Sequence, residues 1–198
     1  MSAREEILGR VRAALAGVDP SGPVPPAPRV PVTDPADLVN LFADRVADYR
    51  AVVERCTAVE LPERLAAALP PGARVVIAPG LGVTVPGAVV DDGLTALELD
   101  QFGAVVTAAR VGIAETGTIV LDHGPGQGRR VISLIPDHHV CLVRTDQVVA
   151  DVPDAIELLD PARPLTWISG PSATSDIELD RVEGVHGPRV LDVIVVEA

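Results

Sequence analysis

The stretch at residues 74–82 has the pattern of a buried strand that ends in a glycine turn: Arg74-Val75-Val76-Ile77-Ala78-Pro79-Gly80-Leu81-Gly82. Its apolar residues do not alternate with polar ones, and a short run that is apolar throughout is typical of a strand covered on both faces. Comparable runs recur at residues 104–107, 118–121, 140–144, 166–169 and 190–196. They alternate with segments of helical spacing, which predicts an α/β fold with a mainly parallel sheet flanked by helices.

The first part of the chain differs in composition from the rest. Ser2 and Glu5 form a capping-box pattern ahead of apolar residues at helical spacing, which predicts a helix. A proline-rich segment follows and favours extended backbone without a core. Asp34-Pro35 then supplies an N-cap and a first-turn proline for a long helix, whose apolar face is predicted to extend to Val53. We therefore expect an N-terminal helix and linker at residues 1–33 and an α/β domain at residues 34–198.

Composition and charge limit the classes of partner. The 198 residues are 47% hydrophobic, enough for a sizeable core, and the formal net charge is -12. This charge disfavours nucleic acid and anionic lipid, because both require clustered positive charge on the protein. All 16 basic residues are arginine, which excludes a Schiff-base lysine and the lysine of a phosphate-binding loop.

Cysteine and histidine usage predicts no metal site and no cofactor bound by cysteine. Cys56 and Cys141 are the only cysteines and cannot by themselves form a four-cysteine zinc or iron–sulfur site. The chain opens with an amphipathic segment instead of a signal peptide, and no apolar run approaches the roughly 18 residues of a membrane span. We expect a reduced, cytoplasmic protein without a membrane span.

Three glycine turns follow predicted strands and are candidates for a small-anion pocket. Ligands of open α/β sheets bind at the carboxyl ends of strands, where such turns expose backbone N–H groups. The candidate ligand-binding residues are Gly80, Gly82, Thr116, Gly117, Gly170, Ser172 and Asp176. Each turn on its own also fits a purely structural role, and Ser172 could simply cap a predicted helix.

Glu115 is the candidate catalytic residue, because this charged side chain lies between small apolar residues and a Thr-Gly turn. Its carboxylate could act as a general base, as a nucleophile toward an acyl group, or as an acceptor for a substrate hydroxyl. It could equally cap a helix or pair with an arginine.

Histidines and arginines offer further candidates. His138 and His139 are adjacent, so on a strand they point to opposite faces and at most one can face a site. Arg129 and Arg130 end a glycine-rich loop, residues 123–130, which we expect to be mobile. They could close over an anionic substrate or remain solvated. The loop lacks the glycine spacing of a dinucleotide fingerprint, so a dinucleotide site is disfavoured.

Four motifs resemble, in order, those of the lactate-utilisation protein C family, also called the LUD domain. They lie at residues 114–118, 133–139, 169–178 and 184–188, and the similarity extends from about residue 34 to the C-terminus. The resemblance adds His186 to the candidate binding residues, and it gives a location to the motif residues without fixing their roles.

The resemblance also implies a fold and a biological role. The fold would be similar to the glucosamine-phosphate deaminase, ribose-phosphate isomerase and CoA-transferase group, the NagB/RpiA/CoA-transferase-like fold. The role would be a part in oxidising L-lactate to pyruvate beside two partner proteins, one of which carries iron–sulfur clusters. The chain itself would then need no cofactor, in agreement with its two cysteines.

Three functions remain open from the sequence. The first is a subunit or accessory protein of a cytosolic lactate-oxidising system, with a small-anion pocket at strand ends. The second is a stand-alone enzyme that acts on a small phosphorylated metabolite or a CoA thioester. The third is a non-catalytic scaffold for partner subunits.

Overall fold

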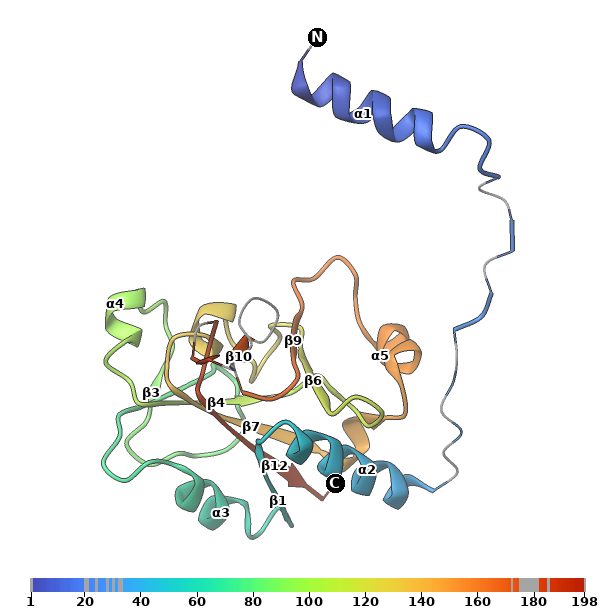
Figure 1. Cartoon of the computed structure of the whole chain (residues 1–198). Helices are drawn as coiled ribbons and strands as arrows, with labels where there is room; N and C mark the ends of the chain where they lie inside the picture. Colours follow the sequence, from blue (N-terminus) through green and yellow to red (C-terminus); the bar gives the residue numbers. More distant parts are fainter. Residues whose placement is uncertain are drawn as a thin grey trace.

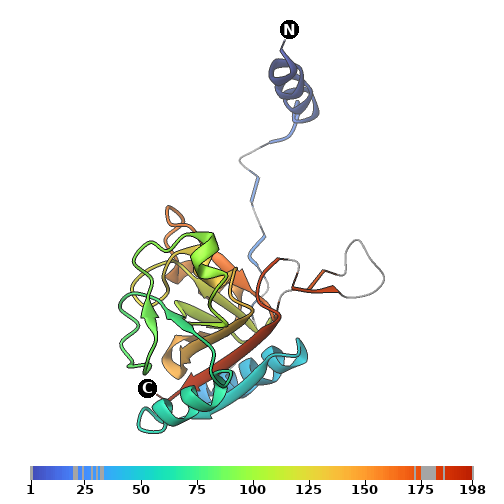
Figure 2. The ribbon, with the colours of Figure 1, turned by 90° about the vertical axis from the view of Figure 1, so that its left-hand side faces the viewer.

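A computed structural model of the chain describes residues 2–19, 22, 23, 25–27, 29, 31, 34–171, 173, 174, 182–184 and 186–197. Helix α1, Ala3–Ala14, begins with the predicted capping box, in which Ser2 Oγ accepts the Glu5 N–H and the Glu5 carboxylate accepts the Ser2 N–H. None of the residues of α1 is buried, and the helix lies apart from the domain in both Figure 1 and Figure 2. No helix in the described part of the chain is long and apolar enough to cross a membrane.

The domain is built on a six-stranded sheet in which every pair of neighbours is parallel. The strand order is β1-β12-β7-β4-β2-β3. The strands are β1 (Val52–Cys56), β2 (Val75–Ile77), β3 (Val89–Val90), β4 (Ala104–Ala108), β7 (His138–Arg144) and β12 (Val190–Val196). The predicted α/β fold with a mainly parallel sheet is therefore confirmed, and the run at residues 74–82 supplies β2.

A second, four-stranded sheet has the order β8-β5-β6-β9. Its strands are β5 (Val111–Ile113), β6 (Thr118–Leu121), β8 (Val148–Val149) and β9 (Thr166–Ile168). The β5–β6 and β6–β9 pairs are antiparallel, whereas β5 and β8 are parallel. The sequence did not distinguish this sheet from the first, because its central strands are buried on both faces and show no alternation.

Helices complete the layers. Helix α2 (Pro35–Asp48) and the second sheet share one apolar cluster with β7 and β12, and α3 (Leu61–Ala68) packs on the opposite face of the parallel sheet. Helix α5 (Val152–Leu158) covers the outer face of the second sheet through Ala155. Short elements complete the chain: α4 (Ala96–Leu99), the 3-10 turns η1 (Arg130–Ser133) and η2 (Thr145–Gln147), and the hairpin of β10 (Ala173–Thr174) with β11 (Val182–Glu183).

Candidate functional site

A cavity of about 260 Å³ lies at the amino ends of β7 and β12. Arg130 and Ser133 of η1, Ser169 and Gly170 after β9, His139 on β7 and His186 before β12 are among its lining residues. Two of the predicted binding residues, Gly170 and His186, therefore lie at one cavity. Ser172 and Asp176 lie outside the described residues, so the structure gives no position for them.

The described lining of this cavity carries a charge opposite in sign to that of the chain. Among the described lining residues there is no aspartate or glutamate, and Arg130 is the lone arginine. The Arg130 side chain is exposed, and within the described part of the structure its guanidinium has no hydrogen-bond or ion-pair partner. In a chain of net charge -12, this leaves a local positive site with free donor groups.

His139 supplies a neutral imidazole to the cavity. It is 1% exposed, and its Nε2 lies 2.8 Å from Thr107 Oγ1 on β4. Burial lowers the pKa of His139 to about 4, with a smaller contribution from the neighbouring His138. His138 points away from this face, and its Nε2 lies 2.7 Å from Asp192 Oδ2. The two histidines therefore point to opposite faces of β7, as predicted, and His139 is the one that lines the cavity.

The Glu115-Thr116-Gly117 turn joins β5 to β6 and packs on α2. Gly117 has φ 59°, and a Cβ built on it would lie 2.5 Å from the backbone carbon of Arg45. Glu115 is exposed, its N–H donates to Ala150 O, and it lines neither this cavity nor the one described next. Thr116 is half-buried and donates from Oγ1 to Thr118 Oγ1.

A second cavity, of about 740 Å³, lies at the carboxyl ends of β2 and β3, where the strand-end argument placed a pocket. Its lining includes Gly80, His123 and Arg129, together with two acidic residues, Asp91 and Asp92. Gly82 lines neither cavity. The acidic residues make this second cavity a poorer place for an anion than the first.

The glycine-rich loop at residues 123–130 is packed, so the expectation of a mobile loop was wrong. Gly126 N–H donates to Pro79 O and Ala108 N–H donates to Gly126 O, each at 2.7 Å. Gly126 thereby connects Pro79, which follows β2, to Ala108, the last residue of β4. His123 has φ 57°. Its Nδ1 lies 2.8 Å from Gly128 O, and its Nε2 lies 2.9 Å from Thr166 Oγ1.

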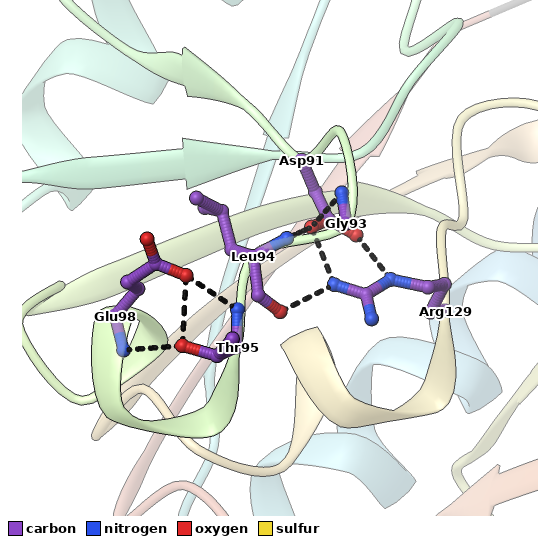
Figure 3. Close-up of polar contacts among 6 residues, drawn as sticks. All are labelled: Asp91, Gly93, Leu94, Thr95, Glu98 and Arg129. Atoms are coloured by element: carbon purple, nitrogen blue, oxygen red, sulfur yellow. Dashed lines mark hydrogen bonds and ion pairs between the residues drawn. The ribbon is translucent and has the colours of Figure 1, made fainter.

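Arg129 connects this loop to the segment after β3 through hydrogen bonds to Asp91 and Leu94 (Figure 3). Its Nε and Nη2 donate to the two carboxylate oxygens of Asp91 at 2.8 and 2.6 Å, and Nη2 also donates to Leu94 O. The Asp91 side chain is 1% exposed and also accepts the N–H groups of Gly93 and Leu94. The hydrogen bonds from Arg129, more than any other contact, hold the pKa of Asp91 below its usual range. Of the two adjacent arginines, Arg130 is therefore the one whose guanidinium has no partner among the described residues.

Substituting Arg129 with methionine is expected to lower the free energy of unfolding by about 2 kcal/mol near neutral pH, because buried Asp91 keeps its charge without a cation. Since the folded-state pKa of Asp91 is depressed, this stabilisation is present above the ordinary aspartate pKa and is lost as pH falls through the folded value. Denaturation of both proteins at neutral pH and near pH 3 should show the difference shrinking in acid.

The matched control is Arg189→Met, which removes an arginine from a pair with Asp137, in which both side chains are 59% exposed. A solvent-exposed pair contributes little to stability, so this variant should lose much less stability than Arg129→Met. Equal losses for the two variants would contradict the role assigned to burial of Asp91.

No three His, Cys, Asp or Glu side chains of the described residues are grouped so that they could hold a metal ion. Both cysteines are buried. Burial raises the pKa of Cys141 to about 12, which keeps this thiol protonated.

Comparison with known proteins agrees with the motifs. A family model described as LUD domain matches residues 94–196. "Lactate utilization protein C" of Deinococcus radiodurans is 47% identical over 203 residues, covering 98% of this chain and 95% of that protein. The protein of the same name from Bacillus subtilis is 34% identical over 97 residues, covering 45% of this chain and 40% of its own length.

A solved structure is also similar. The crystal structure of a DUF162 family protein from Deinococcus radiodurans has 42% sequence identity and a TM-score of 0.71, and the match covers 83% of this chain and 99% of that one. The family match contains every described residue that lines the first cavity, whereas Gly80 and Asp91 of the second cavity precede it. Because the family model matches residues 94–196 and a relative is 47% identical over nearly the full length of both proteins, the chain belongs to the LUD domain family.

Proposed function

We propose that the chain takes part in lactate utilisation, as a subunit or accessory protein of a cytosolic system that oxidises L-lactate to pyruvate, and that the first cavity binds a small carboxylate. The name of the relatives supports the biological role. The observation that carries the binding proposal is Arg130, a cation without a described partner at a cavity whose described lining has no acidic side chain.

The chemistry of the lining suits a small organic acid. A guanidinium donates two parallel N–H groups to a carboxylate, a geometry that a lysine ammonium does not reproduce. His139 remains neutral, and because its Nε2 contacts Thr107 Oγ1, its Nδ1 is the ring nitrogen left for a ligand, without a second charge. A cavity of about 260 Å³ lies just below the roughly 300–1,000 Å³ of pockets for drug-sized ligands, so a small organic acid fits in it.

The proposed division of labour leaves electron transfer to partner proteins. The two cysteines are buried, so this chain offers no exposed thiolate for redox chemistry or for a cluster. A partner that carries iron–sulfur clusters would receive the electrons, and this chain would bind or position the acid.

Deleting the gene in the organism that encodes this chain is expected to impair growth on L-lactate and to leave growth on glucose unchanged. Complementation with the intact gene should restore growth, and a tagged copy should co-purify with a protein that carries iron–sulfur clusters. Unimpaired growth of the deletion strain on lactate would rule out the proposed role.

The two hypotheses differ in what they require of Glu115. A stand-alone enzyme would use its carboxylate as base or nucleophile, whereas the proposed function does not need it. Because Glu115 is exposed and lines neither cavity, Glu115→Gln is expected to change the affinity for pyruvate by less than about twofold and to support growth on lactate. Calorimetry and complementation measure both. Loss of growth with unchanged affinity would favour a catalytic carboxylate instead.

A further inference from the structure

A chain of three hydroxyl groups connects the Glu-Thr-Gly turn with the first cavity. Thr116 Oγ1 donates to Thr118 Oγ1 at 2.7 Å, and Thr118 Oγ1 lies 2.8 Å from Ser169 Oγ. Ser169 lines the cavity, whereas Thr118 is 5% exposed and lines neither cavity. The pairing of β6 with β9, in which Ile119 is opposite Ile168, brings Thr118 and Ser169 together.

The direction of this chain follows from counting protons. Each hydroxyl has one proton to donate and two lone pairs that accept. Thr118 accepts the proton of Thr116, and because Thr118 is 5% exposed its own proton needs an acceptor within the protein. Ser169 Oγ is the one other described contact of Thr118 Oγ1, whereas Ser169 itself is exposed, so we assign Thr118 as the donor in this bond. Ser169 then accepts from Thr118 and keeps its own proton for another acceptor. The described contacts of Ser169 Oγ include no such acceptor in the protein, and the cavity is the space that it borders.

We infer that Ser169 is a ligand-binding donor in this cavity and that Thr116 and Thr118 are positioning residues that fix its proton toward the ligand. This inference rests on the proposed carboxylate site. Arg130 and Ser169 line the same cavity. The inferred ligand presents its carboxylate to Arg130 and a second acceptor oxygen to Ser169. The ligand class is therefore a short monocarboxylate with an oxygen on carbon 2, a 2-oxo or 2-hydroxy acid.

Calorimetric titration of the full chain with pyruvate and with propanoate tests this assignment. Propanoate has the same carboxylate and no oxygen on carbon 2, so it is expected to bind roughly tenfold more weakly than pyruvate. Ser169→Ala should weaken pyruvate binding by a similar factor and leave propanoate binding unchanged. The two acids should then bind this variant about equally, which is the signature of a lost contact to the carbon-2 oxygen.

Thr118 provides the test of positioning. Thr118→Val keeps the shape and removes the hydroxyl, and should weaken pyruvate binding about threefold because Ser169 loses the bond that orients it. Thr118→Ser restores the hydroxyl but leaves a methyl-sized void, and should bind pyruvate like the unchanged protein. A role in packing alone predicts the reverse order, since valine fills the site and serine does not.

The outcomes separate this inference from the proposed function. Failure of the unchanged protein to bind any short carboxylate would remove the proposed site itself. Tight binding of pyruvate that Ser169→Ala leaves intact would overturn the assignment of Ser169 and retain the site. Weaker pyruvate binding by the Thr118→Ser variant than by the Thr118→Val variant would refute the positioning role. Additive effects of Thr118→Val and Ser169→Ala would also refute it, because Thr118 is inferred to act only through Ser169.

Discussion

Gly117→Ala is expected to lower the free energy of unfolding by about 3 kcal/mol, from two separate causes. The backbone at Gly117 has φ 59°, and a residue with a Cβ pays about 1 kcal/mol in this left-handed region. The new Cβ would also lie 2.5 Å from the carbonyl carbon of Arg45, 2.6 Å from its oxygen and 2.7 Å from Val46 N. These are backbone atoms of α2, which cannot retreat without lifting the fully buried Val46 out of the core.

The control for this variant is Gly82→Ala. Gly82 has φ 77°, but a Cβ added to it would meet no atom within 4 Å, so alanine there incurs the backbone penalty without the clash. Its expected loss is about 1 kcal/mol. Denaturant titration of both variants isolates the contact with α2 as the difference between them. Equal losses would show that the Glu-Thr-Gly turn is not held by α2.

The Glu-Thr-Gly turn illustrates what the sequence could predict about the site. An unusual charge beside a glycine turn identified residues 115–117 as a feature that needed explanation. It could not indicate that Gly117 is required by a helix some 70 residues earlier, because that contact exists only after folding. Nor could it separate Glu115, which is exposed, from Thr116, whose hydroxyl is connected through Thr118 and Ser169 to the cavity.

Strand positions were predictable because burial on both faces produces short apolar runs, and β12 lies where its run predicted. The directions and partners of the strands in the second sheet were not predictable, because a run without alternation does not by itself distinguish an antiparallel strand from a parallel one. The predicted length of α2 was wrong for a local reason. Arg50, with φ 67°, follows the helix end, and Val53 then belongs to β1. A non-glycine residue in this conformation gives no signal in the sequence.

The site prediction relied on the carboxyl ends of the parallel strands. There Gly126 connects Pro79, which follows β2, to Ala108, the last residue of β4, and the neighbouring cavity contains two acidic residues. The first cavity lies instead at the amino ends of β7 and β12, because the segments after β9 and before β12 form its walls. Alternation along a strand still predicted that only one of His138 and His139 would face a site, but burial of His139 was not readable from the sequence.

Arg130→Gln is expected to weaken the binding of pyruvate and L-lactate roughly ten- to hundredfold, because a charge-assisted bond to a carboxylate contributes about 1.5–3 kcal/mol and each 1.4 kcal/mol is about tenfold. Calorimetry with each acid measures the loss. Arg130→Lys keeps the charge without the paired donors and should recover only part of the affinity.

The control variant is Arg64→Gln on α3, which makes the same change in net charge on the opposite face of the parallel sheet. It should bind both acids like the unchanged protein, since exposed charges farther apart than about 10 Å are largely screened at moderate salt. If Arg64→Gln and Arg130→Gln lost affinity equally, the effect would come from the overall field of the acidic chain. If neither lost affinity while the unchanged protein bound both acids, the carboxylate would have to lie elsewhere, and Ser169 alone would not define the site.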